Sequence, residues 1–216
     1  MKNNEPKFEI LRMPPENTNS VLVSVGGDAV IFDAWGRASD WVRVLNERGL
    51  TLRAIYSTHG HTDHISAAPE LAEKYNVPWF LNAADNDLIM WGNMLLDYFE
   101  MPRIQPGFRP ATDIKPGHVD VLPGVHMHVY AAPGHSAGGM MYHFPAFQIL
   151  LTGDTIFHDG VGRTDFPGGD ANKLRQTITG LYNLNLPDET YLVHGHGTDS
   201  TIETLKKTNP WFKQAI

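Results

Sequence analysis

Four metal-binding side chains stand close together in the first third of the chain. The segment His59-Gly60-His61-Thr62-Asp63-His64 places three histidines and one aspartate within six residues. In an extended turn, residues two apart point to the same side, so His59 and His61 are expected to grip one ion together. Asp63 and His64 would begin a helix and point toward a second position nearby. Imidazole and carboxylate donors together suit zinc, iron or manganese.

Three further candidate donors each follow a separate apolar run of the sequence. His135 and Asp154 both stand just after such a run, and His196 follows Tyr191-Leu192-Val193. Each has a neighbouring glycine, which permits close approach of the backbone to an ion. Four strand ends are therefore expected to converge on one edge of the core. A structural zinc site is normally closed, with four ligands that are mostly cysteines. Seven histidine and aspartate donors are more than one such site needs, so they favour an open, catalytic site with two metal ions.

The composition excludes several other classes of protein. A chain of 216 residues, 42% hydrophobic and 19% charged, suits a single folded domain over residues 1–216. It has no cysteine, which excludes disulfides, thiolate catalysis and cysteine-type zinc sites. Its formal net charge of −7 argues against nucleic acid as a partner, because phosphates require a basic surface. We find no signal peptide and no apolar run of the ~20 residues that a membrane span needs, so we expect a cytoplasmic protein with no membrane contact.

The pattern around these donors predicts alternating strands and helices. Strands are expected at 21–25, 29–32, 52–57, 77–81, 118–122, 125–132, 139–144, 147–152 and 190–193. Helices are expected from Ser39 or Asp40 to Arg48, from the end of the histidine segment to about Tyr75, over 84–101, over 171–184 with Asp170 as cap, and from Thr201 to about Lys207. Residues 102–117, rich in proline and glycine, predict an irregular loop, either a lid or substrate wall beside the site or a surface connection.

The ordered set of donors resembles the metallo-β-lactamase superfamily over essentially the whole chain. The stretch 160–170 (GVGRTDFPGGD) and the ending Asn209-Pro210-Trp211-Phe212 are similar to the single-domain bacterial relatives of glyoxalase II, the hydroxyacylglutathione hydrolases. The resemblance implies an α/β fold, a four-layer αββα sandwich of two mixed sheets flanked by helices, with the metal site along one edge. It assigns His59, His61 and His135 to a first metal, Asp63, His64 and His196 to a second, and Asp154 as the bridge between them.

The chain departs from the family pattern at two places. The family usually has Pro-Gly-His-Gly around the last ligand, whereas His194 stands at the first of these positions here. We assign the ligand to His196, which matches the family position, and His194 is then a supporting partner or has no role. Full-length glyoxalase II also has a further C-terminal helical region that helps to hold glutathione. This chain stops before such a region, so specificity for glutathione does not follow from the resemblance.

The other polar residues near the motifs are not expected to bind the metal ions directly. Asp33 is expected to orient a ligand imidazole from behind, the alternative being an ordinary turn aspartate. Arg163 and Asp165 either form a structural ion pair or reach the substrate. The other histidines are expected to be ordinary surface or core residues: His118, His126, His128, His143 and His158.

The resemblance points to hydrolysis of a thioester, S-D-lactoylglutathione or a related acyl-glutathione, by a metal-bound hydroxide that Asp63 helps to orient. The cofactors would be two divalent ions, zinc first, with iron or manganese as alternatives. The partner would be a small-molecule thioester, and a homo-oligomer is left open. The alternative activity is that of a persulfide dioxygenase, a sister group with the same fold and one iron. Hydrolysis of β-lactams is not favoured without an export signal, and the non-enzyme alternative is a metal-stabilised binding module.

Overall fold

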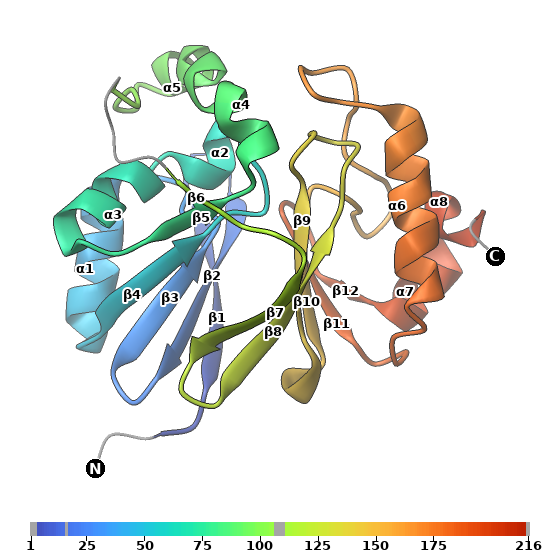
Figure 1. Ribbon diagram of the computed structural model, residues 1–216, viewed down its shortest axis with the longest axis horizontal. Helices are drawn as coiled ribbons and strands as arrows, with labels where there is room; N and C mark the ends of the chain where they lie inside the picture. Colours follow the sequence, from blue (N-terminus) through green and yellow to red (C-terminus); the bar gives the residue numbers. More distant parts are fainter. Residues whose placement is uncertain (1–3, 16, 106–110, 215–216) are drawn as a thin grey trace.

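Two mixed sheets packed face to face, with helices on their outer faces, form the protein in a computed structural model that describes residues 4–15, 17–105 and 111–214 (Figure 1). Sheet A contains, in spatial order, β1 (Lys7–Met13), β2 (Thr18–Val25), β3 (Asp28–Phe32), β4 (Thr51–Tyr56), β5 (Trp79–Leu81) and β6 (Thr112–Asp113). Sheet B contains β12 (Ser200–Thr201), β11 (Tyr191–His194), β10 (Ile149–Gly153), β9 (Met140–Phe144), β8 (Val125–Ala131) and β7 (Gly117–Leu122). This is the predicted αββα sandwich.

Helices cover the outer face of each sheet (Figure 1). On the side of sheet A lie α1 (Ala38–Arg48), α2 (Thr62–Ile65), α3 (Ala68–Tyr75), α4 (Asn86–Trp91) and α5 (Asn93–Tyr98), with a 3₁₀ turn η1 at Ala83–Asp85. On the side of sheet B lie α6 (Ala171–Asn183), α7 (Ile202–Thr208) and α8 (Pro210–Lys213), with a 3₁₀ turn η2 at Pro145–Phe147. None of these described helices has the length and apolar character to cross a lipid bilayer.

The alternating side chains of the strands build separate cores on the two faces of each sheet. In β2, Leu22 faces the helices of sheet A, whereas Val21 and Val23 face sheet B. The inner core between the sheets includes the stacked rings of Phe32 and Tyr56, whose centroids are 5.1 Å apart. Because side chains alternate with a period of two, a strand segment buried on both faces is apolar at consecutive positions, as residues 21–23 of β2 and 29–32 of β3 are. Because the strands pack against a core on each face, the strand ends from which the donor loops begin are held in place.

The predicted helix after the histidine segment is divided in two, and so is the predicted helix over 84–101. The first breaks between α2 and α3, and the second breaks at Gly92 between α4 and α5. A Cβ atom at position 92 would lie 1.3 Å from Thr62 Oγ1. Glycine is therefore required where α4 and α5 pack against the start of α2, and tertiary contact overrides the helical periodicity that the sequence shows.

Several element boundaries also differ from the prediction. Helix α1 begins at Ala38 with Arg37 as N-cap and no side-chain cap, so neither Ser39 nor Asp40 caps it, whereas Gly49 ends it in the left-handed conformation with φ 61° as expected. Strand β5 begins at Trp79 rather than Val77, because the amide of Val77 donates to the carbonyl of Ala72 at the end of α3. The edge strands β1, β6 and β12 and the short helix α8 were not predicted.

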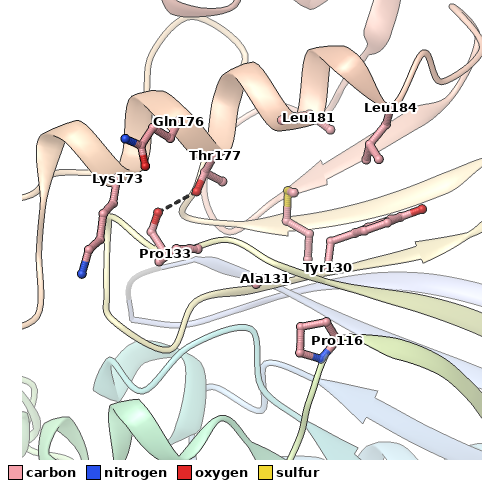
Figure 2. A pocket seen from close by; sticks show the side chains of 11 residues that line it. Pro116, Tyr130, Ala131, Pro133, Lys173, Gln176, Thr177, Leu181 and Leu184 are labelled. Atoms are coloured by element: carbon pink, nitrogen blue, oxygen red, sulfur yellow. Dashed lines mark hydrogen bonds between the residues drawn. The ribbon is translucent and has the colours of Figure 1, made fainter.

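Helix α6 lies across the outer face of sheet B and holds the loop between β8 and β9. Thr177 Oγ1 donates a hydrogen bond to the carbonyl of Pro133 over 2.7 Å, and the amide of Asp170 donates to the carbonyl of Gly134 over 2.7 Å. Asp170 caps the helix, as predicted, by accepting from the amides of Asn172 and Lys173. A cavity of about 380 Å³ remains between α6 and β8. Figure 2 shows the side chains that line it, Tyr130 and Leu181 among them. The hydrogen bonds from Thr177 and Asp170 thus hold the loop that carries His135 against α6.

Candidate metal centre

The seven donors assigned from the sequence lie together at one edge of the sandwich. Their segments follow the carboxyl ends of β4, β8, β10 and β11, and these loops meet at the edge beside α4 (Figure 1). All seven occur in three clusters that share His59 and His64, and within each cluster one ligand atom from each residue lies within 4.8 Å of the others. Segments far apart in the sequence therefore contribute to one centre.

His59, His61 and His135 form the first group of donors. His61 Nδ1 lies 2.9 Å from His135 Nε2, which lies 3.2 Å from His59 Nε2. All three side chains are buried. Three imidazole nitrogens that face one point out of contact with bulk water form a suitable set of ligands for a transition metal.

Asp63, His64 and His196 form the second group. Asp63 Oδ2 lies 2.9 Å from His196 Nε2 and 3.6 Å from His64 Nε2. Asp63 and His64 come from the first turn of α2, directly after the first-group histidines. A single turn from extended chain into helix thus directs the donors of one short segment to two positions.

Asp154 lies between the two groups. Its Oδ1 is 3.3 Å from His64 Nε2, and its Oδ2 is 3.6 Å from both His135 Nε2 and His196 Nε2. An alanine Cβ in place of Gly195 would lie 1.9 Å from Asp154 Oδ1, so glycine is needed for the carboxylate to stand here. Its two carboxylate oxygens thus lie near histidines of both groups.

Unpartnered polar atoms show that this donor set fits metal ions. His61 Nε2, His64 Nε2 and Asp154 Oδ1 are buried and have no hydrogen-bond partner among the described residues. Such atoms are costly to bury unless something satisfies them. For His64 Nε2 and Asp154 Oδ1, which face each other within the donor set, a divalent cation would supply the missing partner. Five imidazoles and two carboxylates at one point thus fit a dinuclear metal centre.

His59 and His61, two histidines of the first group, are held neutral. Burial lowers the pKa of His59 well below its ordinary value, and the surrounding imidazoles, His64 and His135 among them, lower it further. Burial likewise lowers the pKa of His61 to about 4, with a contribution from His135. Because a metal binds the unprotonated nitrogen, these rings are ready to coordinate at neutral pH.

The carboxylates of the centre are held ionised. Burial raises the pKa of Asp154, but the charges of His64 and His196 outweigh it and bring the pKa below its ordinary value. Burial also raises the pKa of Asp63, and His64 and the hydrogen bond with His196 likewise outweigh it. The pKa of His64 is lowered by burial and raised more strongly by the acidic residues around it, so it lies well above its ordinary value. The site therefore requires positive charge, which a proton on His64 or a divalent ion supplies.

Asp33 stands behind both groups of donors. Its Oδ2 lies 3.0 Å from His64 Nδ1, and its Oδ1 accepts a hydrogen bond from the amide of Thr58 over 2.7 Å. Thr58 Oγ1 donates to Asp33 Oδ2 over 2.9 Å and lies 3.0 Å from His59 Nδ1. Thus Asp33 contacts His64 directly and His59 through Thr58. In both rings Nε2 is left facing the donor cluster, which is how outer-shell carboxylates orient metal ligands.

Two residues that the sequence analysis did not identify tie the ligand loops together. The fully buried Asp85 accepts hydrogen bonds from the amide of Gly60 (2.9 Å), from Ser136 Oγ (2.7 Å) and from the amide of Gly138 (2.6 Å). It thereby joins the loop after β4 to the loop after β8. Asn19, in β2, donates through Nδ2 to the carbonyls of His194 (3.0 Å) and Gly197 (3.1 Å), which holds the loop after β11. Neither residue belongs to a motif, so no local signal marks them.

His194 lies outside both groups of donors. It is fully buried, with Nδ1 2.9 Å from Thr152 Oγ1 and Nε2 2.7 Å from Ser200 Oγ. Burial lowers the pKa of His194 to about 4, so the ring is neutral. Since both ring nitrogens are engaged by hydroxyl groups, His194 supports the strand beneath the site, and His196 is the residue that reaches Asp63.

A cavity of about 370 Å³ opens onto the donors. Its outer wall includes Trp91, Leu95, Phe166 and Arg163. The guanidinium of Arg163 lies 3.7 Å from the centre of the Phe166 ring and donates to both carboxylate oxygens of Asp165, over 2.7 and 2.6 Å. Arg163 therefore forms the ion pair and also faces the cavity.

Of the two alternatives predicted for the stretch 102–117, a lid or substrate wall and a surface connection, the described part does not form the wall. Residues 106–110 lie outside the described residues, and none of 102–105 or 111–117 lines the cavity at the donors. Ile104 instead packs into the core beneath α5 together with Leu96. The cavity wall comes from α4, α5 and residues 163–166, so the described part of this stretch serves as a connection.

Comparison with known sequences identifies the family. The model of the metallo-β-lactamase superfamily matches residues 13–196. A probable metallo-hydrolase of Bacillus subtilis, YqgX, is 31% identical over 209 residues, which are 93% of this chain and 95% of the relative. The hydroxyacylglutathione hydrolase GloC of Haemophilus influenzae is 32% identical over 186 residues, 85% of this chain and 87% of the relative.

Several solved structures have the same fold as this chain. The B3 metallo-β-lactamase BLEG-1 has a TM-score of 0.84 at 28% identity, over 95% of this chain and 99% of that one. TTHA1623 in a di-iron-bound form has a TM-score of 0.82 at 28% identity, over 94% and 99%. ETHE1 of Myxococcus xanthus has a TM-score of 0.75 at 27% identity, over 94% and 83%. The family match, the shared sandwich and the donors along its edge agree: this chain belongs to the metallo-β-lactamase superfamily.

Proposed function

We propose that the protein is a metal-dependent hydrolase that cleaves a thioester, S-D-lactoylglutathione or a related acyl-glutathione. The observation that carries this proposal is the position of Asp154 between two complete groups of donors, which suits a two-metal hydrolytic centre. The likeness to GloC, named a hydroxyacylglutathione hydrolase, supports the choice of substrate. Zinc is the proposed metal, because nitrogen and oxygen donors suit it.

Each group of donors would hold one metal ion, and Asp63 would also orient the attacking water. His59, His61 and His135 would hold one ion and Asp63, His64 and His196 the other, with Asp154 between them. When bound, the two ions lower the pKa of water and polarise the substrate carbonyl. Asp63 lines the cavity and its carboxylate is ionised, so it can accept a hydrogen bond from the attacking water and orient it. The leaving thiolate needs no proton from the protein to depart.

The residues that line the cavity suit a small substrate that has an apolar part and a negative charge. Trp91, Leu95 and Phe166 offer an apolar wall beside the donors. Arg163 presents a guanidinium on the same side, where it can approach a carboxylate of the substrate when its pairing with Asp165 shifts. A volume of about 370 Å³ suits part of an acyl-glutathione, with the remainder extending to the solvent.

The experiment is an assay of the purified, metal-loaded protein with S-D-lactoylglutathione, in which released glutathione is measured with a thiol reagent. Turnover well above the buffer rate is expected, together with about two zinc ions per chain in elemental analysis. Arg163→Ala should raise KM more than it lowers kcat if Arg163 approaches the substrate. No turnover with full metal occupancy would contradict the proposed substrate.

A persulfide dioxygenase with one iron is the second candidate, favoured by the likeness to ETHE1. The two activities depend on different donors, because a one-iron enzyme does not need the second group. His196→Ala would therefore abolish hydrolysis but leave oxygen uptake on glutathione persulfide. One iron per chain with oxygen uptake would support the dioxygenase, and two ions with thioester cleavage would support the hydrolase.

A further inference from the structure

The hairpin of β7 and β8 carries a second concentration of histidines, away from the metal centre. Its antiparallel register pairs His118 with His128 and Asp120 with His126. Residues two apart along a strand point to the same face, and residues directly opposite each other share a face. All four side chains therefore stand on one face of a two-stranded ladder. These histidines are inconspicuous in the sequence, because the residues that meet come from both strands.

Three of these side chains converge through their donor atoms. Asp120 Oδ1 lies 2.6 Å from His126 Nδ1 and 3.2 Å from His118 Nε2. The rings of His118 and His126 are stacked, with centroids 5.5 Å apart and planes 25° apart. One ligand atom from each of the three residues lies within 4.8 Å of the others. Two nitrogens and one oxygen thus face a common point.

The charge at this point suits a cation. Among the described ion pairs, Asp120 is paired only with these two imidazoles and with no lysine or arginine. Two imidazoles and a carboxylate are donors that suit divalent copper, nickel and zinc. The side chains are 54–76% exposed, so an ion can enter from solvent and keep water in its remaining coordination positions.

The hairpin cluster is separate from the metal centre. His126 stands at the turn end of β8, and the loop with His135 follows the other end of the same strand. A seven-residue strand spans about 20 Å. Figure 1 shows the β7–β8 turn at the opposite end of the sandwich from α4.

We propose that His118, Asp120 and His126 form a second metal site, which binds one divalent transition-metal ion and ties the edge strand β7 to β8. Copper is held more tightly than nickel or zinc by donors of this kind, so Cu²⁺ is the most sensitive probe. The ion is held by the three residues that converge. His128, the fourth corner of the ladder, lies with its ring centroid 5.3 Å from that of His118 and is not required.

The experiment adds Cu²⁺ to protein whose resident metals are in place. Copper and resident metals are counted per chain by elemental analysis after gel filtration, and electron paramagnetic resonance detects imidazole nitrogen bound to copper. The wild type is expected to gain one Cu²⁺ per chain with no loss of resident metal. His118→Ala and His126→Ala should each raise the Kd for copper at least tenfold, and Asp120→Asn should raise it less.

His128→Ala is the matched control, because it removes an exposed histidine from the same hairpin. It should leave the Kd within about threefold of the wild type and leave turnover of substrate unchanged. Three results would overturn the proposal: no added copper at micromolar concentration, copper gained only in exchange for resident metal, or equal affinity in His118→Ala and the wild type. Loss of affinity in His128→Ala equal to that in His118→Ala would also overturn the assigned set of ligands.

Discussion

Sheet A delivers four donors from one six-residue segment after β4, whereas sheet B delivers three donors from three separate loops. The segment of sheet A needs only one turn of chain, from strand into α2, to aim its side chains at two positions. The donors of sheet B depend on the relative placement of β8, β10 and β11. They also depend on Asp85 and Asn19, which hold two of those loops to the other half of the molecule.

The metal centre thus combines donors that are neighbours in the sequence with donors that only the fold brings together. A donor from the sheet A segment belongs to one group, and its neighbours in sequence remain in place when it is lost. Asp154, from sheet B, stands between the groups and has no neighbouring residue that can replace it. The consequences of removing single donors should differ accordingly.

The largest effect is expected for Asp154→Ala. Loss of the carboxylate removes contacts to His64, His135 and His196 at once, so metal content should fall at both positions. Hydrolysis should fall by at least about 1,000-fold, because two-metal catalysis requires both ions. The fold should survive at modest cost, since the lost stabilisation is chiefly that of ion binding. Elemental analysis, turnover and circular dichroism measure these three quantities, and two retained ions with wild-type rates would refute the bridging role.

His64→Ala should have a smaller effect on metal content. His64 contacts Asp154 and Asp63, but the three histidines of the first group remain. About one ion per chain should be retained, with hydrolysis reduced on the order of 100-fold or more. His128→Ala, an exposed histidine outside the centre, is the control and should retain both ions. Loss of both ions in His64→Ala would mean that the two groups do not bind independently.

Asp33→Asn should weaken metal binding without removing any donor. The amide keeps the shape of the side chain but loses the charge that faces His64 Nδ1. Replacing such outer-shell partners typically costs about 10–100-fold in metal affinity. Competition with a chelator measures the affinity. Asp28→Asn, at the other end of β3, is the matched control, because Asp28 pairs with the exposed Arg53. Equal affinities in the two variants would show that Asp33 does not act on the metal ligands.

The sequence was most informative where residues that act together are neighbours in the chain. The histidine segment, the glycine-flanked positions of His135, Asp154 and His196, and the alternating strands all led to the observed edge and the observed sandwich. The break at Gly92 was missed, because the periodicity of residues 84–101 says nothing about Thr62 packing against that position. Asp85 was missed because its partners, Gly60, Ser136 and Gly138, are brought to it only by the folded sheets.

The smallest expected effect is on the pH dependence of stability, and it comes from a histidine of sheet B that belongs to neither group of donors. His143, in β9, is buried, and its Nδ1 has no hydrogen-bond partner among the described residues. Burial lowers the pKa of His143, with a smaller contribution from His128. The unfolded chain therefore takes up a proton at higher pH than the folded protein does, and the stability that the neutral ring contributes is complete only above the ordinary histidine pKa near 6.5.

As the pH falls below that value, this contribution is lost until the folded-state pKa of His143 is passed. The melting temperature of metal-loaded wild type should thus fall between pH 7 and pH 5, and it should fall less in His143→Leu, which has no proton to bind. His118→Leu is the control, because that ring is exposed and is not among the groups that lower the pKa of His143, so the slope should stay close to that of the wild type. Equal slopes in wild type and His143→Leu would mean that water or a rearranged neighbour stabilises the charged ring inside sheet B.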